Sequence, residues 1–127
     1  MKTKEIENII AKIHPNISKD YKSDAKVLLF SNVFARLDAF PAMGGDGTIA
    51  EYHWDENKIF IYTDLINNEE DIIRSLIHEC VHSKQSYDLY MAYYECDLDY
   101  HTHPYEIEAE YEEENWEKYK LNTNKFG

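Results

Sequence analysis

The sequence predicts an α+β fold in a single domain that spans residues 1–127. Several segments repeat apolar residues every three or four positions, which is typical of amphipathic helices. Two short segments near the middle of the chain are rich in β-branched and aromatic residues, which indicates a small twisted sheet built on a hairpin. A chain of 127 residues with 43% hydrophobic content is long enough for one core, and no second domain is expected.

Two helices are expected before the sheet. The first is predicted over residues 4–13, where isoleucines recur at helical spacing, and it is expected to end at His14-Pro15 because a residue before proline disfavours helical backbone. The second is predicted from a cap at residues 18–20 to about Asp38. A loop is expected over Pro41–Gly47, since its glycines are not followed by the Gly-Lys-Ser/Thr of a phosphate-binding loop.

The hairpin is predicted from two strands, at residues 48–54 and 58–63, joined by a turn at Asp55-Glu56-Asn57. Its second strand is expected to lead through residues 64–68 into a long helix. That helix is predicted over residues 69–92, because Asn67-Asn68 supplies a cap, acids fill the first turn, and no Gly or Pro interrupts the segment. A further helix is expected to start at Pro104, a residue that suits the first helical turn.

The most informative motif is His78-Glu79-Cys80-Val81-His82, an HExxH sequence inside the predicted long helix. Residues at i and i+4 lie on one face about one turn apart, so His78 and His82 can bind the same metal ion. Glu79 is then placed to act on a metal-bound water. The motif predicts a zinc-dependent hydrolase that cleaves peptide bonds, with Zn²⁺ as its cofactor and Glu79 as its catalytic residue.

The order of a strand followed by an HExxH helix resembles the zincin metallopeptidases, in which the sheet edge beside the metal helix binds an extended peptide or protein substrate. The run from Glu106 to Glu110 resembles the ExxA(D/E) segment of the gluzincins. This resemblance implies that Glu106 is the third zinc ligand and that Glu110 hydrogen-bonds a ligand histidine. The wider pattern, HExxHxxQ followed by PxExEA, is similar to small bacterial and phage metallopeptidases and covers about residues 58–115.

The residues themselves leave the third ligand open among Glu106, Glu108 and Glu110, with His101 and His103 as further possibilities. A donor to a tetrahedral oxyanion is also needed in such a site. The candidates for it are Tyr87, Tyr100, Tyr105 and His103. The other acids of the C-terminal segment, including residues 112–114, are expected to form a solvated face.

The net charge of −12 argues against nucleic acid as a partner, because phosphates need Lys and Arg. No stretch is apolar enough to span a membrane, no signal peptide is recognised, and two distant cysteines do not form a disulfide framework, so a cytoplasmic protein is expected. Two alternative functions stay open. One is an acidic inhibitor that mimics nucleic acid, and the other is a zinc-binding module without catalysis.

Overall fold

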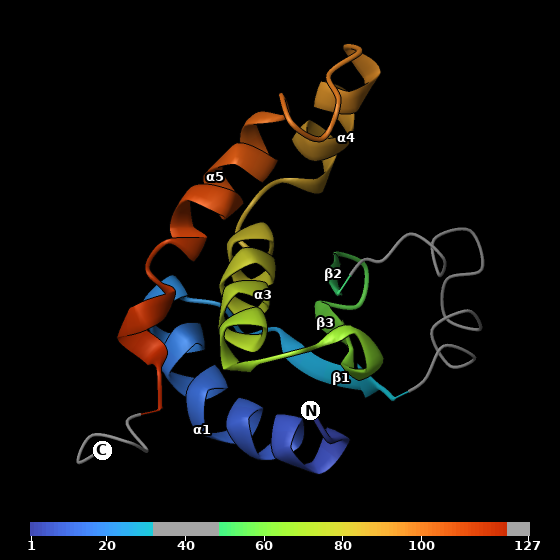
Figure 1. Cartoon of the computed structure of the whole chain (residues 1–127). Coiled ribbons are helices and arrows are strands. Elements are labelled where there is room, and N and C mark those ends of the chain that lie inside the picture. The colour runs from blue at the N-terminus through green and yellow to red at the C-terminus, as the bar shows by residue number, and fades with distance from the viewer. Residues whose placement is uncertain (32–48, 122–127) are drawn as a thin grey trace.

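The computed structural model describes residues 1–31 and 49–121 (Figure 1). In chain order it contains helix α1 (Thr3–Tyr21), strands β1 (Lys26–Phe30), β2 (Ala50–His53) and β3 (Lys58–Tyr62), helices α3 (Glu69–His82), α4 (Tyr87–Glu95) and α5 (Pro104–Glu113), and 3₁₀ turns at Thr63–Leu65 and Trp116–Tyr119. The described residues therefore form an α+β fold, as predicted. None of their helices combines the length and the apolar character needed to cross a bilayer.

The sheet has the order β1-β3-β2, with β1 parallel and β2 antiparallel to the central strand. The predicted hairpin is confirmed, since β2 pairs with β3 through the register Ala50 to Ile61. Asn57 closes the turn with φ 54°, a left-handed conformation that asparagine tolerates better than most residues. β2 is thus an edge strand of the described sheet, beside α3 (Figure 1).

The core lies where α1 and the sheet pack against α3. Isoleucines at 6, 10, 13 and 17 form one buried stripe along α1, as a period of 3.6 residues requires. They meet a second buried stripe on α3 that includes Ile72, Ile73, Leu76 and Ile77. Because α3 is covered by α1 on one side and by β2 and α5 on others, the HExxH residues are held on the most enclosed helix of the fold.

The predicted boundaries of the two N-terminal helices are wrong. α1 runs through Pro15 to Tyr21, because Ile17 continues the buried stripe and its burial offsets the hydrogen bond that proline removes. Residues 26–30 form β1 and not helix, since Val27 to Phe30 pair along β3 and tertiary pairing outweighs local preference. The rest of the predicted second helix and the Pro41–Gly47 loop lie outside the described residues.

The long helix predicted over residues 69–92 is two helices. α3 ends at His82, and α4 begins after Ser86, whose hydroxyl accepts a hydrogen bond from the backbone N–H of Leu89. The Gln85 carbonyl between them accepts a hydrogen bond from the indole N–H of Trp54. This tertiary contact and the serine cap stabilise a change of direction that no Gly or Pro marks in the sequence.

α5 starts at Pro104, as predicted. His103 caps it, because its Nδ1 accepts a hydrogen bond from the backbone N–H of Tyr105. Ala109 is fully buried and Glu106 is nearly so, which shows the face that α5 turns towards α3. This packing carries the acidic helix to the HExxH residues.

Candidate metal centre

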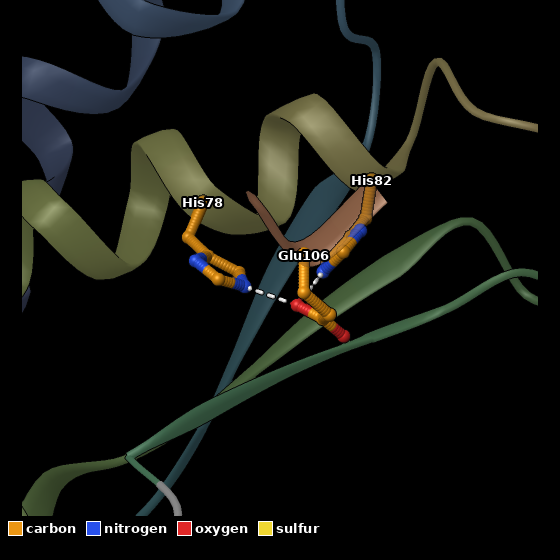
Figure 2. Close-up of side chains that lie close together, drawn as sticks. All are labelled: His78, His82 and Glu106. Atoms are coloured by element: carbon orange, nitrogen blue, oxygen red, sulfur yellow. Dashed lines mark hydrogen bonds and ion pairs between the residues drawn. The ribbon is translucent and has the colours of Figure 1, made fainter. Parts of the chain in front are cut away.

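His78 and His82 project from the same face of α3 towards Glu106 on α5 (Figure 2). The Nε2 atoms of the two imidazoles lie 2.9 Å and 3.0 Å from one oxygen, Oε1 of Glu106. All three side chains are buried. Residues from two helices, at least 24 positions apart in the chain, therefore meet at a single point.

The other ring nitrogens also face oxygen acceptors. Nδ1 of His82 lies 2.7 Å from Oε1 of Gln85, and Nδ1 of His78 lies 2.6 Å from Oε2 of Glu113. The amide nitrogen of Gln85 donates elsewhere, to the Tyr105 carbonyl and to Glu108, so its oxygen accepts the proton of His82 Nδ1. Such contacts hold each ring in one orientation and leave Nε2 as the ligand atom, as in histidine metal sites generally.

The three side chains suit a divalent metal ion. Their ligand atoms all lie within 4.8 Å of one another, and two imidazoles with one carboxylate are a set that zinc accepts with a position left for water. Burial lowers the pKa values of the two histidines, but hydrogen bonds and charge interactions with neighbouring carboxylates, above all Glu106, outweigh it and raise both pKa values. A divalent cation bound by these atoms would take the place of the two Nε2 protons and would carry the same total positive charge as those two protons.

The pKa values of the two carboxylates of the site, Glu106 and Glu79, are shifted in opposite directions. Burial alone would raise the pKa of Glu106, but hydrogen bonds from His78 and His82 hold that pKa well below its usual range. For Glu79 burial dominates and raises the pKa, although the neighbouring imidazoles oppose the shift. Metal-assisted general-base chemistry uses such a pair of carboxylates. One is ionised and can bind the metal, and the other has a raised pKa and accepts a proton more readily than an ordinary carboxylate.

The triad and Glu79 line a cleft of about 1200 Å³. Residues of α3 form one wall, the edge strand β2 forms another, and aromatic side chains close it near His82. Trp54 lies at that end, with its ring centroid 5.7 Å from His82 and 4.8 Å from Tyr90. The site is therefore a metal-ligand group at the side of a large cleft.

The predicted donors to an oxyanion divide into two groups. Tyr87 and Tyr100 line the cleft. The ring of Tyr105 instead packs against Tyr93. His103 is fully buried between α4 and α5, where both ring nitrogens are used in backbone hydrogen bonds. His103 therefore has a structural position, and Tyr87 and Tyr100 are the predicted donors that line the cleft.

Glu110 does not occupy the position expected for it. It is exposed, and the carboxylate beside His78 belongs to Glu113, which had been expected on a solvated face. The reason is the direction in which each side chain leaves the helix. Glu113, seven positions after Glu106, lies within about 20° of it around the helix axis, whereas Glu110, four positions after it, is rotated by about 40°. The buried Ala109 lies on the Glu113 side, so this side of α5 faces α3.

The other candidates for the third ligand also lie elsewhere. Glu108 is exposed and accepts a hydrogen bond from Gln85, and His101 is exposed in the segment before α5. The sequence predicted no role for Tyr90, whose hydroxyl donates to Oε2 of Glu106, or for Trp54. The position of Tyr90 depends on the break between α3 and α4, and the contacts of Trp54 depend on how the hairpin packs against these helices, so no local pattern marks either residue.

We expect the purified protein to bind about one zinc ion per chain. Replacing His78 or His82 by alanine should abolish stoichiometric binding, because each substitution removes one of three ligands. Metal analysis after gel filtration measures this directly. His101→Ala is the matched control, since it removes an exposed histidine. Full zinc retention in both α3 variants would rule out this centre.

Glu113→Ala should weaken zinc affinity by about 10–100-fold, because it removes the carboxylate that orients His78. Glu110→Ala, which removes an exposed carboxylate from the same helix, should leave affinity close to wild type. Competition with a chromophoric chelator gives both dissociation constants. The opposite ranking of the two variants would favour the assignment of Glu110 drawn from the sequence.

Comparison with known proteins gives no family for this chain. No family model matches it, and neither curated proteins nor solved structures contain a significant match. The chemistry of the site therefore rests on its own residues: two buried imidazoles and a buried carboxylate that share one point, and Glu79 beside them in a cleft.

Proposed function

We propose that the protein is a zinc-dependent metallopeptidase of the zincin type, with His78, His82 and Glu106 as the zinc ligands. The observation that carries this proposal is the meeting of both Nε2 atoms and one carboxylate oxygen inside a cleft. Two imidazoles and a glutamate are the ligand set of thermolysin-like catalytic zinc sites. The arrangement of an HExxH helix beside an antiparallel edge strand supports the same class.

Glu79 is the proposed general base. When bound, zinc supplies Lewis acidity and lowers the pKa of a coordinated water to about 7. Glu79 lines the cleft on the helical turn between the two ligand histidines, and burial favours its protonated form once it has accepted a proton. We propose that it takes the proton of the attacking water and passes it to the leaving amine. Tyr87 or Tyr100, which line the same cleft, would donate to the oxyanion.

The edge strand supports an extended peptide as the substrate. The backbone N–H of Tyr62 donates to the Ile49 carbonyl at 2.8 Å, so residues 49, 51 and 53 face β3 in the alternating antiparallel pattern. The main-chain groups of Ala50 and Tyr52 then point away from β3. Both residues line the cleft, so a substrate strand can pair with them beside the metal ligands.

The charges of the cleft favour a neutral or basic peptide. Six carboxylates line it, and they are Glu51, Asp55, Asp71, Glu79, Glu106 and Glu113. Arg74 is the one Lys or Arg among the lining residues of the described chain, and its guanidinium is paired with Glu70 and Glu114. Even with a divalent cation bound the cleft stays negative, which disfavours acidic substrates.

Two other functions draw on the acidity of the chain or on the metal site alone. A nucleic-acid mimic is suggested by the net charge of −12, but Glu106 and Glu113 contact histidines and so are not available to a basic partner. A zinc-binding module without catalysis would use the same triad. Glu79 within the cleft favours the catalytic alternative over it.

We place this activity in the cytoplasm. Cys80 is buried and Cys96 is exposed, and both are free thiols. Exposed free thiols suit a reducing compartment.

Replacing Glu79 by glutamine should leave the zinc content near wild type and abolish hydrolysis, because the amide cannot accept the proton of the water. A peptide pool made by digesting a cell proteome, analysed by mass spectrometry, serves as substrate. Glu117→Gln, the same change at an exposed position, is the control. Full activity of Glu79→Gln would exclude this mechanism, and loss of zinc would make Glu79 a ligand.

The sites cleaved in that peptide pool should be enriched in Lys and Arg and depleted of Asp and Glu around the cleaved bond. The physical reason is the negative cleft, whose attraction for basic peptides should weaken as salt is added. Cleavage of acidic and basic peptides at equal rates would show that the carboxylates of the cleft do not select the substrate.

A further inference from the structure

The two oxygens of Glu106 have different partners. Oε1 faces the Nε2 atoms of His78 and His82, whereas Oε2 accepts a hydrogen bond from the hydroxyl of Tyr90. Tyr90 comes from α4, which lies beyond the end of the motif helix. The third ligand of the proposed centre is therefore held from a third helix.

We infer that Tyr90 is a positioning residue that keeps Glu106 as a ligand through Oε1 alone. This inference rests on the proposed zinc centre. A glutamate that binds a metal through both oxygens occupies two positions around it, whereas catalytic zinc needs one of those positions for water. The Tyr90 hydroxyl already donates a hydrogen bond to Oε2 and so opposes binding of the metal through both oxygens. The fourth position around the metal then stays open for water.

Tyr90 is itself held firmly. Its ring lies between Trp54 and His103, with centroids 4.8 Å and 4.5 Å away, and meets His82 edge-on at 5.4 Å. Its backbone carbonyl accepts a hydrogen bond of 2.8 Å from Nε2 of His103. The orientation of the phenol is thus determined by contacts on three sides.

His103 links this tyrosine to the helix that carries Glu106. One ring nitrogen binds the Tyr90 carbonyl on α4, and the other accepts the N–H of Tyr105 at the start of α5. The ring is fully buried, so neither bond is exchanged for water. The two helices are therefore tied together one residue from Glu106, and the distance between the phenol and the carboxylate is maintained.

The hydroxyl of Tyr90 is the donor in this contact, because a carboxylate oxygen can only accept. Tyr94, one turn further along α4, also lines the cleft. Its hydroxyl lies 3.5 Å from the hydroxyl of Tyr90. Among the hydrogen bonds of the described residues, the one to Oε2 of Glu106 comes from Tyr90.

The test compares Tyr90→Phe with Tyr93→Phe. Both remove one phenolic hydroxyl from α4 and keep the ring, but Tyr93 packs on His103 and Tyr105 and is not among the residues lining the cleft. Two properties are measured without any substrate: zinc affinity by chelator competition, and the visible absorption of the Co²⁺ form. Far-UV circular dichroism checks that both variants are folded.

Tyr90→Phe should weaken zinc binding by about 10–100-fold. Its Co²⁺ form should absorb more weakly in the visible range, since a two-oxygen glutamate raises the coordination number and four-coordinate Co²⁺ is the stronger absorber. Tyr93→Phe should match wild type in both measurements. A simple loss of packing would not change the Co²⁺ spectrum in this way.

Two results would overturn the role of Tyr90. One is wild-type affinity and an unchanged Co²⁺ spectrum in Tyr90→Phe. The other is a phenolate-to-copper charge-transfer band in the Cu²⁺ form that disappears in Tyr90→Phe, which would make Tyr90 a ligand. Either result leaves the zinc centre intact if His78→Ala and His82→Ala still lose zinc, whereas zinc retention in those two variants would refute the centre itself.

Discussion

The contact of Glu106 with both imidazoles of α3 is the interaction on which the functional half of the molecule depends. A buried carboxylate is strongly unfavourable unless charge and hydrogen bonds compensate it, and here the compensating groups come from a helix that is distant in sequence. α5 packs against α3 with Glu106 and Glu113 facing the histidines, and these contacts fix the rotation of α5 about its own axis. A metal ion bound by these residues would join α3 and α5 directly, so metal affinity and the stability of this half of the fold would be coupled.

The rest of the fold supports α3 as a rigid platform. Its buried apolar stripe packs on the isoleucines of α1, and β3 provides the central strand behind it. Beyond α5 the chain returns to this platform, where Tyr119 donates to Asp20 on α1 and the N–H of Leu121 donates to Glu69 at the start of α3. These bonds hold the C-terminal end of the acidic segment against α1 and α3. As a result the spacing between the edge strand β2 and the HExxH residues follows from core packing, which is how a cleft can keep its width before any substrate binds.

α4 differs from the other helices, because none of its residues is buried. Its position depends on the aromatic contacts of Tyr90 with Trp54 and His103, and on the hydrogen bond that His103, the cap of α5, donates to the Tyr90 carbonyl. Two of these side chains, Tyr90 and Trp54, also line the end of the cleft near His82. Tyr90 therefore both orients Glu106 and borders the cleft, so the position of α4 and the geometry of the metal site are linked.

Local patterns in the sequence determined a large part of this structure. The α+β class, the β2–β3 hairpin, the cap of α3 and the start of α5 at Pro104 all follow from neighbouring residues, because turns, caps and helical spacing act over a few positions. The HExxH spacing likewise places His78 and His82 on one face of a helix. Tertiary structure decided the rest: that α1 continues through Pro15, that residues 26–30 pair as a strand, that α3 ends at His82, and that Glu113 and not Glu110 contacts His78. Each of these depends on which distant surface a segment packs against. Glu110 and Glu113 differ by about 60° around the axis of α5, and packing against α3, not a local preference, decides which of them contacts His78.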